Sequence, residues 1–395
     1  MPHNRTEETW MSTIYPSRAK LLFVACSLMF GGLAMAAASP SRIDIAVSDA
    51  AKVVMQQYNI PGLAVALTID GQQHFYNFGV ASKDTQAKVS SDTLFELGSI
   101  SKTLTATLAT YAQASGQLSL SDHPGKYLPQ LKGSAFDKVT LMNLGTHTAG
   151  GFALQVPDAV QNTAQLMDYL QAWQPQYPAG AKRTYANPSI GMLGMITAKA
   201  MNMPFEQAME QQLLPRLGLG NTWLTVPANK MPSYAQGYDK QDQPIRLQGG
   251  VLGAEAYGLK SSARDMLHFV EANMAMTPME PLIKQALAQT HAGYFKVGAM
   301  TQALIWEHYV YPVALETLQE GNSSKMVFET QPVTAINPPI APLQNAWINK
   351  TGSTNGFGGY LAFVPEKKIG IVILANKNYP NAARVKLAYG ILSGL

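Results

Sequence analysis

Three short stretches of this 395-residue chain carry side chains suited to acyl transfer on a serine. In the first, Ser99 precedes Lys102 by three residues, a spacing that places both on one face of a helix. A serine hydroxyl is a weak nucleophile until a base takes its proton, and a desolvated lysine beside other cations can be that base. Apolar periodicity from Lys102 to Gly116 predicts that Ser99 lies at a helix start, where negative charge is favoured. An N-capping serine and a solvated lysine would look the same, and Ser17-Arg18-Ala19-Lys20 repeats the spacing.

The second stretch, Tyr185-Ala186-Asn187, comes directly before Pro188 and a helical pattern. Proline suits the first position of a helix, so we expect Tyr185 and Asn187 on the loop that enters it. Two nearby ammonium groups would lower the pKa of a phenol below its ordinary value of about 10, so that it could carry protons during the reaction. The Asn187 amide has an oxygen for a lysine and a nitrogen for a substrate. The alternative is a packed tyrosine with an N-capping asparagine, since Tyr379-Pro380-Asn381 has the same spacing.

The third stretch, Lys350-Thr351-Gly352, lies on a predicted strand that continues through Ser353. On an edge strand beside the nucleophile, Lys350 and Thr351 would offer a charge and a hydroxyl to a substrate carboxylate, and Gly352 would let a substrate backbone lie close. The N–H groups of Ser99 and Ser353 would then form an oxyanion hole. The alternative is a polar strand end before a turn. The order and predicted settings of the three stretches together favour the catalytic interpretation.

Other chemistries find little support. The seven histidines include no His-x-x-x-His pair, which argues against a zinc hydrolase, and Gly-x-Ser-x-Gly, P-loop and dinucleotide-binding patterns are missing. The formal charge is +4, with no basic run longer than Lys367-Lys368, so we expect no nucleic-acid partner. The sequence therefore predicts an enzyme without a metal or cofactor that acts on a small molecule.

Strand patterns occur at both ends of the chain. Asp70-Gly71 joins two strand-like runs, which is a strong hairpin signal, and three more strands are expected near the C-terminus. A helix beside each group would cover the sheet, so we expect the two ends to meet in one antiparallel sheet. The predicted elements are helices over 41–58 and 381–393 and strands over 63–69, 73–79, 346–352, 359–364 and 370–374.

The middle of the chain is rich in Ala, Leu, Met and Gln and predicts helices over 100–115, 160–172, 188–202 and 204–216. The expected fold class is therefore α/β (α+β), an antiparallel sheet flanked by N- and C-terminal helices, with an inserted, mostly helical subdomain. The predicted domains are a discontinuous sheet domain over 39–98 and 260–395 and a helical subdomain over 99–259, with the active site between them.

The N-terminus has the pattern of an export signal. Basic residues precede an apolar stretch over 21–34, and small residues suited to cleavage follow near Ala36 to Ala38. The apolar stretch is shorter than the roughly 20 residues that span a membrane. We therefore expect residues 1–38 to be a cleaved signal peptide, and the mature protein to lie in the periplasm without stable membrane association. Cys26, the only cysteine, would leave with the signal peptide.

Together these features closely resemble the class C β-lactamases, the periplasmic cephalosporinases, from about residue 41 to the end. Tyr-Ala-Asn stands where class A enzymes and penicillin-binding proteins carry Ser-Asp-Asn, as is typical of class C. Longer runs that resemble the family are Phe95-Glu96-Leu97-Gly98, Leu154-Gln155-Val156-Pro157-Asp158, Ala254-Glu255-Ala256-Tyr257-Gly258 and Leu374-Ala375-Asn376-Lys377-Asn378-Tyr379-Pro380-Asn381.

The resemblance implies a β-lactamase/transpeptidase-like fold. It also implies a monomeric enzyme that hydrolyses the β-lactam amide, preferentially of cephalosporins, through an acyl-serine intermediate. Catalysis would fall to Ser99, Lys102, Tyr185 and Lys350, with the choice of base between Lys102 and Tyr185 left open. The residues that the resemblance implies for substrate binding are Gln155, Asn187, Tyr257, Thr351, Gly352, Asn378 and Asn381.

Three positions depart from the family pattern. Asn349 stands where histidine or tyrosine is frequent, Ile305 where glycine is common, and 250–253 replaces a segment with proline and aspartate. The last borders the expected side-chain pocket, so it bears on substrate range and leaves the reaction unchanged. The alternatives are a D-Ala-D-Ala carboxypeptidase or penicillin-binding protein, which shares every triplet, a serine esterase of the same fold, and a non-catalytic cell-wall binding module.

Overall fold

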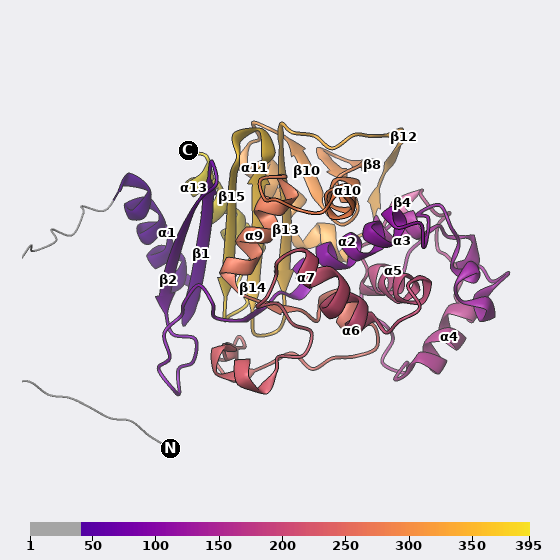
Figure 1. The fold of residues 1–395 in the computed structure, drawn as a ribbon, viewed down its shortest axis with the longest axis horizontal. Helices are drawn as coiled ribbons and strands as arrows, with labels where there is room; N and C mark the ends of the chain where they lie inside the picture. Colours follow the sequence, from indigo (N-terminus) through magenta and orange to yellow (C-terminus); the bar gives the residue numbers. More distant parts are fainter. Residues whose placement is uncertain (1–40) are drawn as a thin grey trace, which may run out of the picture. The chain divides into compact units, whose positions relative to one another are not determined.

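A nine-stranded antiparallel sheet runs through the computed structural model, which describes residues 41–395 (Figure 1). Its strands follow the order β12-β8-β9-β10-β13-β14-β15-β1-β2, so the N-terminal hairpin pairs with the last strand of the chain. The predicted meeting of the two ends in one sheet is confirmed. The predicted signal peptide lies outside the described residues.

The elements have the following bounds. The strands of the large sheet are β1 (Gly62–Ile69), β2 (Gln72–Gly79), β8 (Gly293–Val297), β9 (Met300–Gln302), β10 (Glu307–Val310), β12 (Thr334–Ile340), β13 (Ala346–Ser353), β14 (Gly358–Val364) and β15 (Ile369–Ala375). The short strands are β3 (Phe95–Glu96), β4 (Lys182–Arg183), β5 (Gly237–Tyr238), β6 (Pro244–Ile245), β7 (Lys260–Ser261) and β11 (Gln331–Pro332). The helices are α1 (Arg42–Tyr58), α2 (Ser101–Ala114), α3 (Leu141–Gly145), α4 (Thr163–Ala172), α5 (Asn187–Ala200), α6 (Phe205–Gln207), α7 (Leu214–Arg216), α8 (Gly253–Tyr257), α9 (Ala263–Asn273), α10 (Pro281–Thr290), α11 (Leu315–Gly321), α12 (Ser324–Phe328) and α13 (Asn381–Leu392).

Local sequence signals explain the first helix and hairpin. Ser41 and Asp44 form a capping box at the start of α1, in which each side chain accepts the backbone N–H of the other residue. The turn between β1 and β2 has Asp70 at φ 50° and Gly71 at φ 84°. This pair of left-handed residues is what a two-residue hairpin turn requires, so Asp70-Gly71 fixes the register of the hairpin.

The sheet separates two hydrophobic cores. In β15, Ile371 and Ile373 face the core beneath α1 and α13, whereas Val372 and Leu374 face the core on the other side. Alternation of this kind is what a strand buried on both faces produces. Helices α1 and α13 contact each other on one face, and α9 packs against β15 and β1 on the other (Figure 1).

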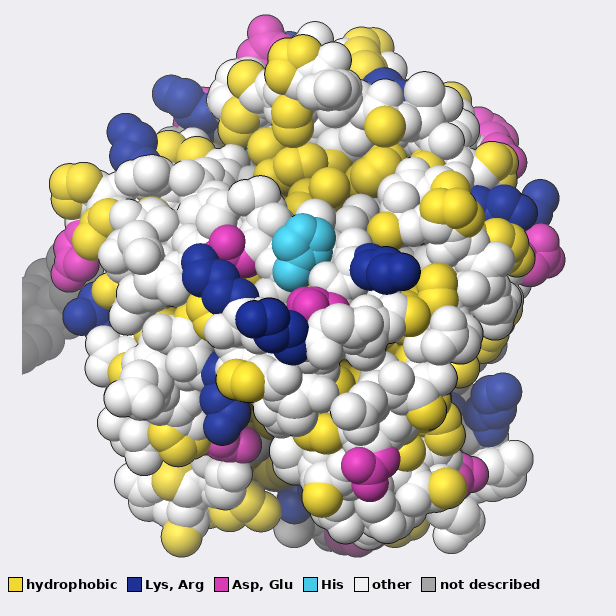
Figure 2. Space-filling model, turned by 90° about the vertical axis from the view of Figure 1, so that its right-hand side faces the viewer, with side chains coloured by type: hydrophobic (Ala, Val, Ile, Leu, Met, Phe, Trp, Pro, Cys, Tyr) yellow, Lys and Arg dark blue, Asp and Glu magenta, His cyan; other side chains and the backbone are white. Residues whose placement is uncertain are grey.

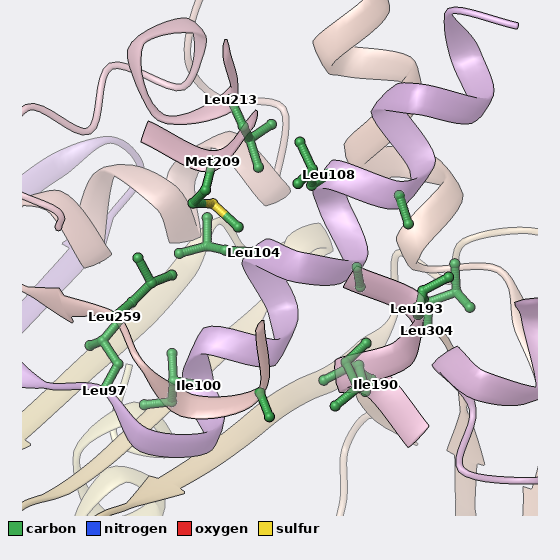
Figure 3. Packing of buried hydrophobic residues seen from close by; sticks show 14 of the residues in the cluster. Leu97, Ile100, Leu104, Leu108, Ile190, Leu193, Met209, Leu213, Leu259 and Leu304 are labelled. Carbon is green, nitrogen blue, oxygen red and sulfur yellow. The ribbon is translucent and has the colours of Figure 1, made fainter. Parts of the chain in front are cut away.

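Helix α2 lies at the centre of the helical part and is buried on nearly all sides. Helices α5, α8 and α10 all contact it. Leu104 and Leu108 of α2 lie close to Met209 and Leu213 (Figure 3), which belong to a π-helical turn over 208–213 that interrupts the predicted helix over 204–216. Because protein interiors are closely packed, this burial fixes the start of α2, where the candidate nucleophile lies.

Two features of the sheet differ from expectation. The prediction that β13 is an edge strand is wrong, because β13 lies between β10 and β14. However, β10 pairs with β13 only as far as Asn349, so residues 350–353 have no partner strand on that side. Strands β8, β9, β10 and β12, which the sequence analysis did not predict, extend the sheet. The division of the chain at 98/99 and 259/260 stays a prediction.

One face of the described part of the chain is shown in Figure 2. Lysine and arginine side chains are scattered on it among acidic and uncharged groups, and hydrophobic side chains gather in its upper half. Between residues 41 and 395, every helix is too short or too polar to cross a membrane.

Candidate active site

All of the predicted site residues except Lys102 line one cleft of about 1460 Å³. The cleft walls include the 3₁₀ turn over 98–100 before α2, the segment entering α5, the end of β13 and the loop between β15 and α13. Lys102 is fully buried beside it and reaches the hydroxyl of Ser99. Stretches that lie far apart in the sequence therefore meet at one place.

Ser99 lies in a single 3₁₀ turn (98–100) that leads directly into α2, as the helix-start prediction requires. The Nζ atom of Lys102 donates to Ser99 Oγ at 2.8 Å and to the carbonyl oxygen of Ala256 at 2.8 Å. Burial lowers the pKa of Lys102 to about 8; Tyr185 opposes this change and Lys350 adds to it. Lys102 is thus held against the serine oxygen, and its pKa is much lower than that of an exposed lysine.

Tyr185 is buried between the two lysines. The Nζ atoms of Lys102 and Lys350 each lie 5.4 Å from the centroid of its ring. Burial alone would raise the pKa of Tyr185, but Lys102, Lys350 and a hydrogen bond with Ser99 together lower it to about 8. The phenol is therefore much more acidic than an ordinary tyrosine and lies beside the nucleophile.

The unpaired end of β13 faces the serine. Lys350 is 2% exposed and its Nζ donates to the carbonyl oxygen of Thr351 at 2.8 Å. Gly352 lies directly against the turn that carries Ser99, because a Cβ atom there would overlap the carbonyl oxygen of Leu97. Gly98, with φ 52°, is packed in the same way against the backbone of Ser353. Both glycines are required by this close approach of two backbones.

The predicted amide-binding residues are brought together. Asn187 Nδ2 donates to Gln155 Oε1 at 2.9 Å, while Asn187 Oδ1 is buried and has no partner among the described residues. Asn187 is the first residue of α5, with Ala186 as its N-cap and Pro188 second. The prediction that Asn187 lies on the preceding loop is therefore wrong by one residue, because the helix begins before the proline.

The other end of the cleft contains Asn378 and Asn381 and a residue that the sequence analysis missed. Arg384 is fully buried, and its guanidinium donates to Gly352 O at 2.8 Å and to Asn378 Oδ1 at 2.6 Å. Burial lowers the pKa of Arg384 to about 10, which Tyr379 opposes. In the sequence, Arg384 looks like any solvent-exposed arginine of a helix, so no sequence pattern identified it as a residue of the cleft. Arg384 ties the loop after β15 to β13.

Tyr257 forms a half-buried wall of the cleft at the end of α8. Its ring lies against Gly253, where a Cβ atom would meet it at 3.2 Å. The preceding Leu252 has φ 61°, an unusual conformation for a branched residue. The divergent segment 250–253 is thus in contact with the residue that shapes this wall.

The two other departures from the family pattern lie outside the cleft. Ile305 has φ 69°, which glycine adopts without strain and a β-branched residue does not, so the conformation suits the glycine that the family resemblance implies there. Asn349 is fully buried and its Nδ2 donates to Glu307 Oε2 at 3.1 Å. Glu307 in turn lies 3.5 Å from Arg183, which precedes the tyrosine stretch. Asn349 is bonded through its backbone to Lys350, and its side chain is linked to Arg183 through Glu307.

Taken by themselves, these groups can carry out nucleophilic acyl transfer. They supply an alcohol, two groups of lowered pKa that can move its proton, and cations beside a place for a substrate anion. Over residues 41–395, no three His, Cys, Asp or Glu side chains lie close enough to hold a metal ion.

Comparisons with known proteins agree with this chemistry. A family model described as Beta-lactamase matches residues 47–395. A β-lactamase of Lysobacter lactamgenus is 55% identical over 376 residues, covering 94% of this chain and 98% of that protein. A solved structure described as a β-lactamase/D-alanine carboxypeptidase from Pseudomonas syringae has a TM-score of 0.88 at 58% identity, covering 89% of this chain and 99% of that one. A class C β-lactamase in complex with cefoxitin has a TM-score of 0.87 at 50% identity, with the same coverage.

Proposed function

This chain belongs to the β-lactamase family, and we propose that its cleft hydrolyses β-lactam amides through an acyl-enzyme on Ser99. The protein is a class C serine β-lactamase. The observation that carries the assignment of the nucleophile is the 2.8 Å contact between Lys102 Nζ and Ser99 Oγ, with Tyr185 beside both. Cephalosporins are the proposed preferred substrates, as is typical of class C.

Acylation begins when Ser99 Oγ attacks the carbonyl carbon of the lactam. Its proton passes to Lys102 or Tyr185, and the pKa of about 8 of each makes both effective near neutral pH. The N–H groups of Ser99 and Ser353 hold the negative oxygen of the tetrahedral intermediate. The lactam C–N bond then breaks, and the same proton moves on to the nitrogen. The support for this scheme is the close approach of the Gly98 backbone, next to Ser99, to the backbone of Ser353.

Deacylation needs a water molecule in place of the lactam nitrogen. Tyr185 lies beside Ser99 and takes the proton of that water, and the acyl–oxygen bond of the intermediate then breaks with return of the proton to Ser99. Deacylation distinguishes a β-lactamase, which turns over, from a protein that stays covalently acylated by the β-lactam.

Substrate binding is assigned to both ends of the cleft. Gln155 and Asn187, which already share a hydrogen bond, bind the amide side chain, and Tyr257 forms the wall beside it. Lys350 and Thr351 bind the substrate carboxylate, together with Asn378 and Asn381, while Gly352 leaves space for the substrate backbone.

A D-alanine carboxypeptidase is the second candidate, because the Pseudomonas syringae relative is described with both activities. Incubation with a chromogenic cephalosporin separates the two. We expect many turnovers per enzyme, and a fall of at least about 10³-fold in Ser99→Ala. Stoichiometric labelling of Ser99 without turnover, with release of D-alanine from a peptide ending in D-Ala-D-Ala, would instead assign the peptidase activity.

We also propose a monomeric, periplasmic mature protein without a resident metal or cofactor. Its support is the signal pattern over 1–38 and the completeness of the cleft within one chain. Fractionation of expressing cells, mass measurement and light scattering test this. A cytoplasmic full-length product or a stable dimer would contradict it.

A further inference from the structure

His147 is a fully buried residue that the sequence analysis did not single out. It follows α3 in a turn fixed by side-chain hydrogen bonds, in which Asn143 Nδ2 donates to Thr148 Oγ1 at 3.0 Å and Thr146 Oγ1 lies 2.8 Å from Thr148 Oγ1. Its own backbone has φ 59°, a conformation uncommon for a residue other than glycine. A buried residue in a strained conformation invites a functional explanation.

His147 makes two hydrogen bonds and a ring contact with the segment around Tyr185. The backbone oxygen of His147 accepts the N–H of Thr184 at 2.9 Å, and its ring Nδ1 accepts the N–H of Ala186 at 3.3 Å. The imidazole also lies against the phenol ring, with centroids 4.4 Å apart and planes tilted by 39°. His147 therefore forms a hydrogen bond with the residue on each side of Tyr185 and packs against the ring of Tyr185.

The imidazole in this position is neutral. Because Nδ1 is an acceptor, the proton lies on Nε2, which is buried and has no hydrogen-bond partner in the described part of the chain. Burial lowers the pKa of His147 well below its ordinary value, and the cations Arg183, Lys102 and Lys350 lower it further. Leaving a buried N–H unpaired is unfavourable, so packing alone would be served better by an apolar ring.

We propose that His147 is a positioning residue for Tyr185. Its two acceptor atoms fix the N–H groups of Thr184 and Ala186, and these two hydrogen bonds hold the phenol of Tyr185 between Lys102 and Lys350. This role deepens the proposed function and rests on it, because it matters to the reaction only if Tyr185 moves protons. Displacement of a proton-transferring group by about 1 Å is enough to slow a reaction by about 10²-fold.

Two substitutions separate the parts of this arrangement. His147→Asn keeps an acceptor near the position of Nδ1 and tolerates positive φ, whereas His147→Phe keeps a ring and removes the acceptor. We expect His147→Phe to raise the pKa of Tyr185 from about 8 toward its ordinary value of about 10 and to lower kcat by about 10-fold. We expect His147→Asn to remain within about threefold of the native kcat, because a conservative acceptor restores the hydrogen bond.

The main measurement is an ultraviolet titration of the phenolate, taken as the difference between each protein and its Tyr185→Phe counterpart. It needs no turnover, so a native enzyme that fails to hydrolyse cephalosporins would remove the proposed function without removing this inference. Thr184→Val is the matched control, since it removes the contact of Thr184 with Thr330 (3.1 Å) and keeps the N–H that His147 holds. The pH profile of kcat should move with the titration.

The inference is overturned if His147→Phe leaves both the titration of Tyr185 and kcat unchanged. It is also overturned if His147→Asn loses as much as His147→Phe, or if Thr184→Val changes the titration equally. Should His147→Phe fail to fold, His147→Gln replaces it. The glutamine amide lies one carbon further from the backbone than the asparagine amide, so we expect it to miss the N–H of Ala186. The same rise of the pKa is then expected, and an unchanged pKa is again decisive against the inference.

Discussion

Replacing Lys350 by glutamine tests whether the two lysines activate Tyr185. The Nζ atom of Lys350 lies 5.4 Å from the ring centroid of Tyr185. At that separation and an effective dielectric constant of about 20, a unit charge stabilises the phenolate by about 3 kcal/mol. At about 1.36 kcal/mol per pKa unit, this corresponds to a change of about two pKa units. We expect Lys350→Gln to raise the pKa of Tyr185 from about 8 to about 10.

The sign follows from the charge that is removed. A cation favours the phenolate over the phenol, so its loss raises the pKa and reduces the phenolate at pH 7 by about 10²-fold. Lys350 also holds down the pKa of Lys102, so the acidic limb of the kcat profile should move to higher pH whichever group is the base.

The assay combines an ultraviolet titration of Tyr185 with kcat for a chromogenic cephalosporin measured across pH. Using kcat limits the contribution of weaker carboxylate binding, which appears mainly in KM. Lys377→Gln is the control, because Lys377 lines the same cleft but is paired with Asp242. A titration and an acidic limb that stay within a few tenths of a pH unit of the native enzyme would refute the electrostatic reasoning.

Three further substitutions probe the nucleophile, the cleft support and the acid response. Ser99→Ala should abolish covalent labelling by penicillin while changing the free energy of unfolding by less than about 1 kcal/mol, as mass spectrometry and urea unfolding would reveal. Arg384→Met should lower the free energy of unfolding by about 3 kcal/mol, because it removes the donor to the buried carbonyl oxygen of Gly352 and to the partly buried Asn378 Oδ1; an unchanged melting temperature would contradict this. Burial lowers the pKa of His308 to about 3, so this imidazole stays neutral in the native protein, whereas in the unfolded chain it takes up a proton below about pH 6.5. The contribution of neutral His308 to the free energy of unfolding is therefore complete above that pH and is about 2 kcal/mol smaller at pH 5. In His308→Gln, the free energy of unfolding measured from unfolding curves should fall by about 2 kcal/mol less between these pH values.

Much of the fold follows from local signals in the sequence. Asp70-Gly71 supplies the two left-handed residues of the hairpin, and the alternating or continuous apolar runs of β1, β14 and β15 give their burial directly. Strands β8 to β10 are short, and β12 is mostly exposed with two prolines, so neither period nor composition marks them. Helix 204–216 is interrupted by a π turn that no local pattern announces.

The candidate site divides in the same way. Ser99 and Lys102 could be found because their contact is local, one helical turn apart. Arg384 and His147 could not, because each acts on backbone groups 32 or 37 to 39 residues away in the sequence, and only the folded chain brings them there. The edge-strand prediction for β13 was wrong for a related reason, since the point where β10 ends is set by tertiary contacts.

The contact between Gly98 and the end of β13 also bears on how this enzyme can change under drug selection. The close contact of two backbone segments positions Ser99 and Ser353. A side chain at Gly98 or at Gly352 would force these two segments apart. An inhibitor that draws its affinity from main-chain N–H groups there offers no side chain whose replacement would release it. We expect resistance to such an inhibitor to arise instead from changes in the cleft walls, for example through segment 250–253, which packs against the wall residue Tyr257. The backbone contact that positions the nucleophile therefore tolerates little substitution, whereas substitutions in the cleft walls can change which β-lactams the enzyme accepts.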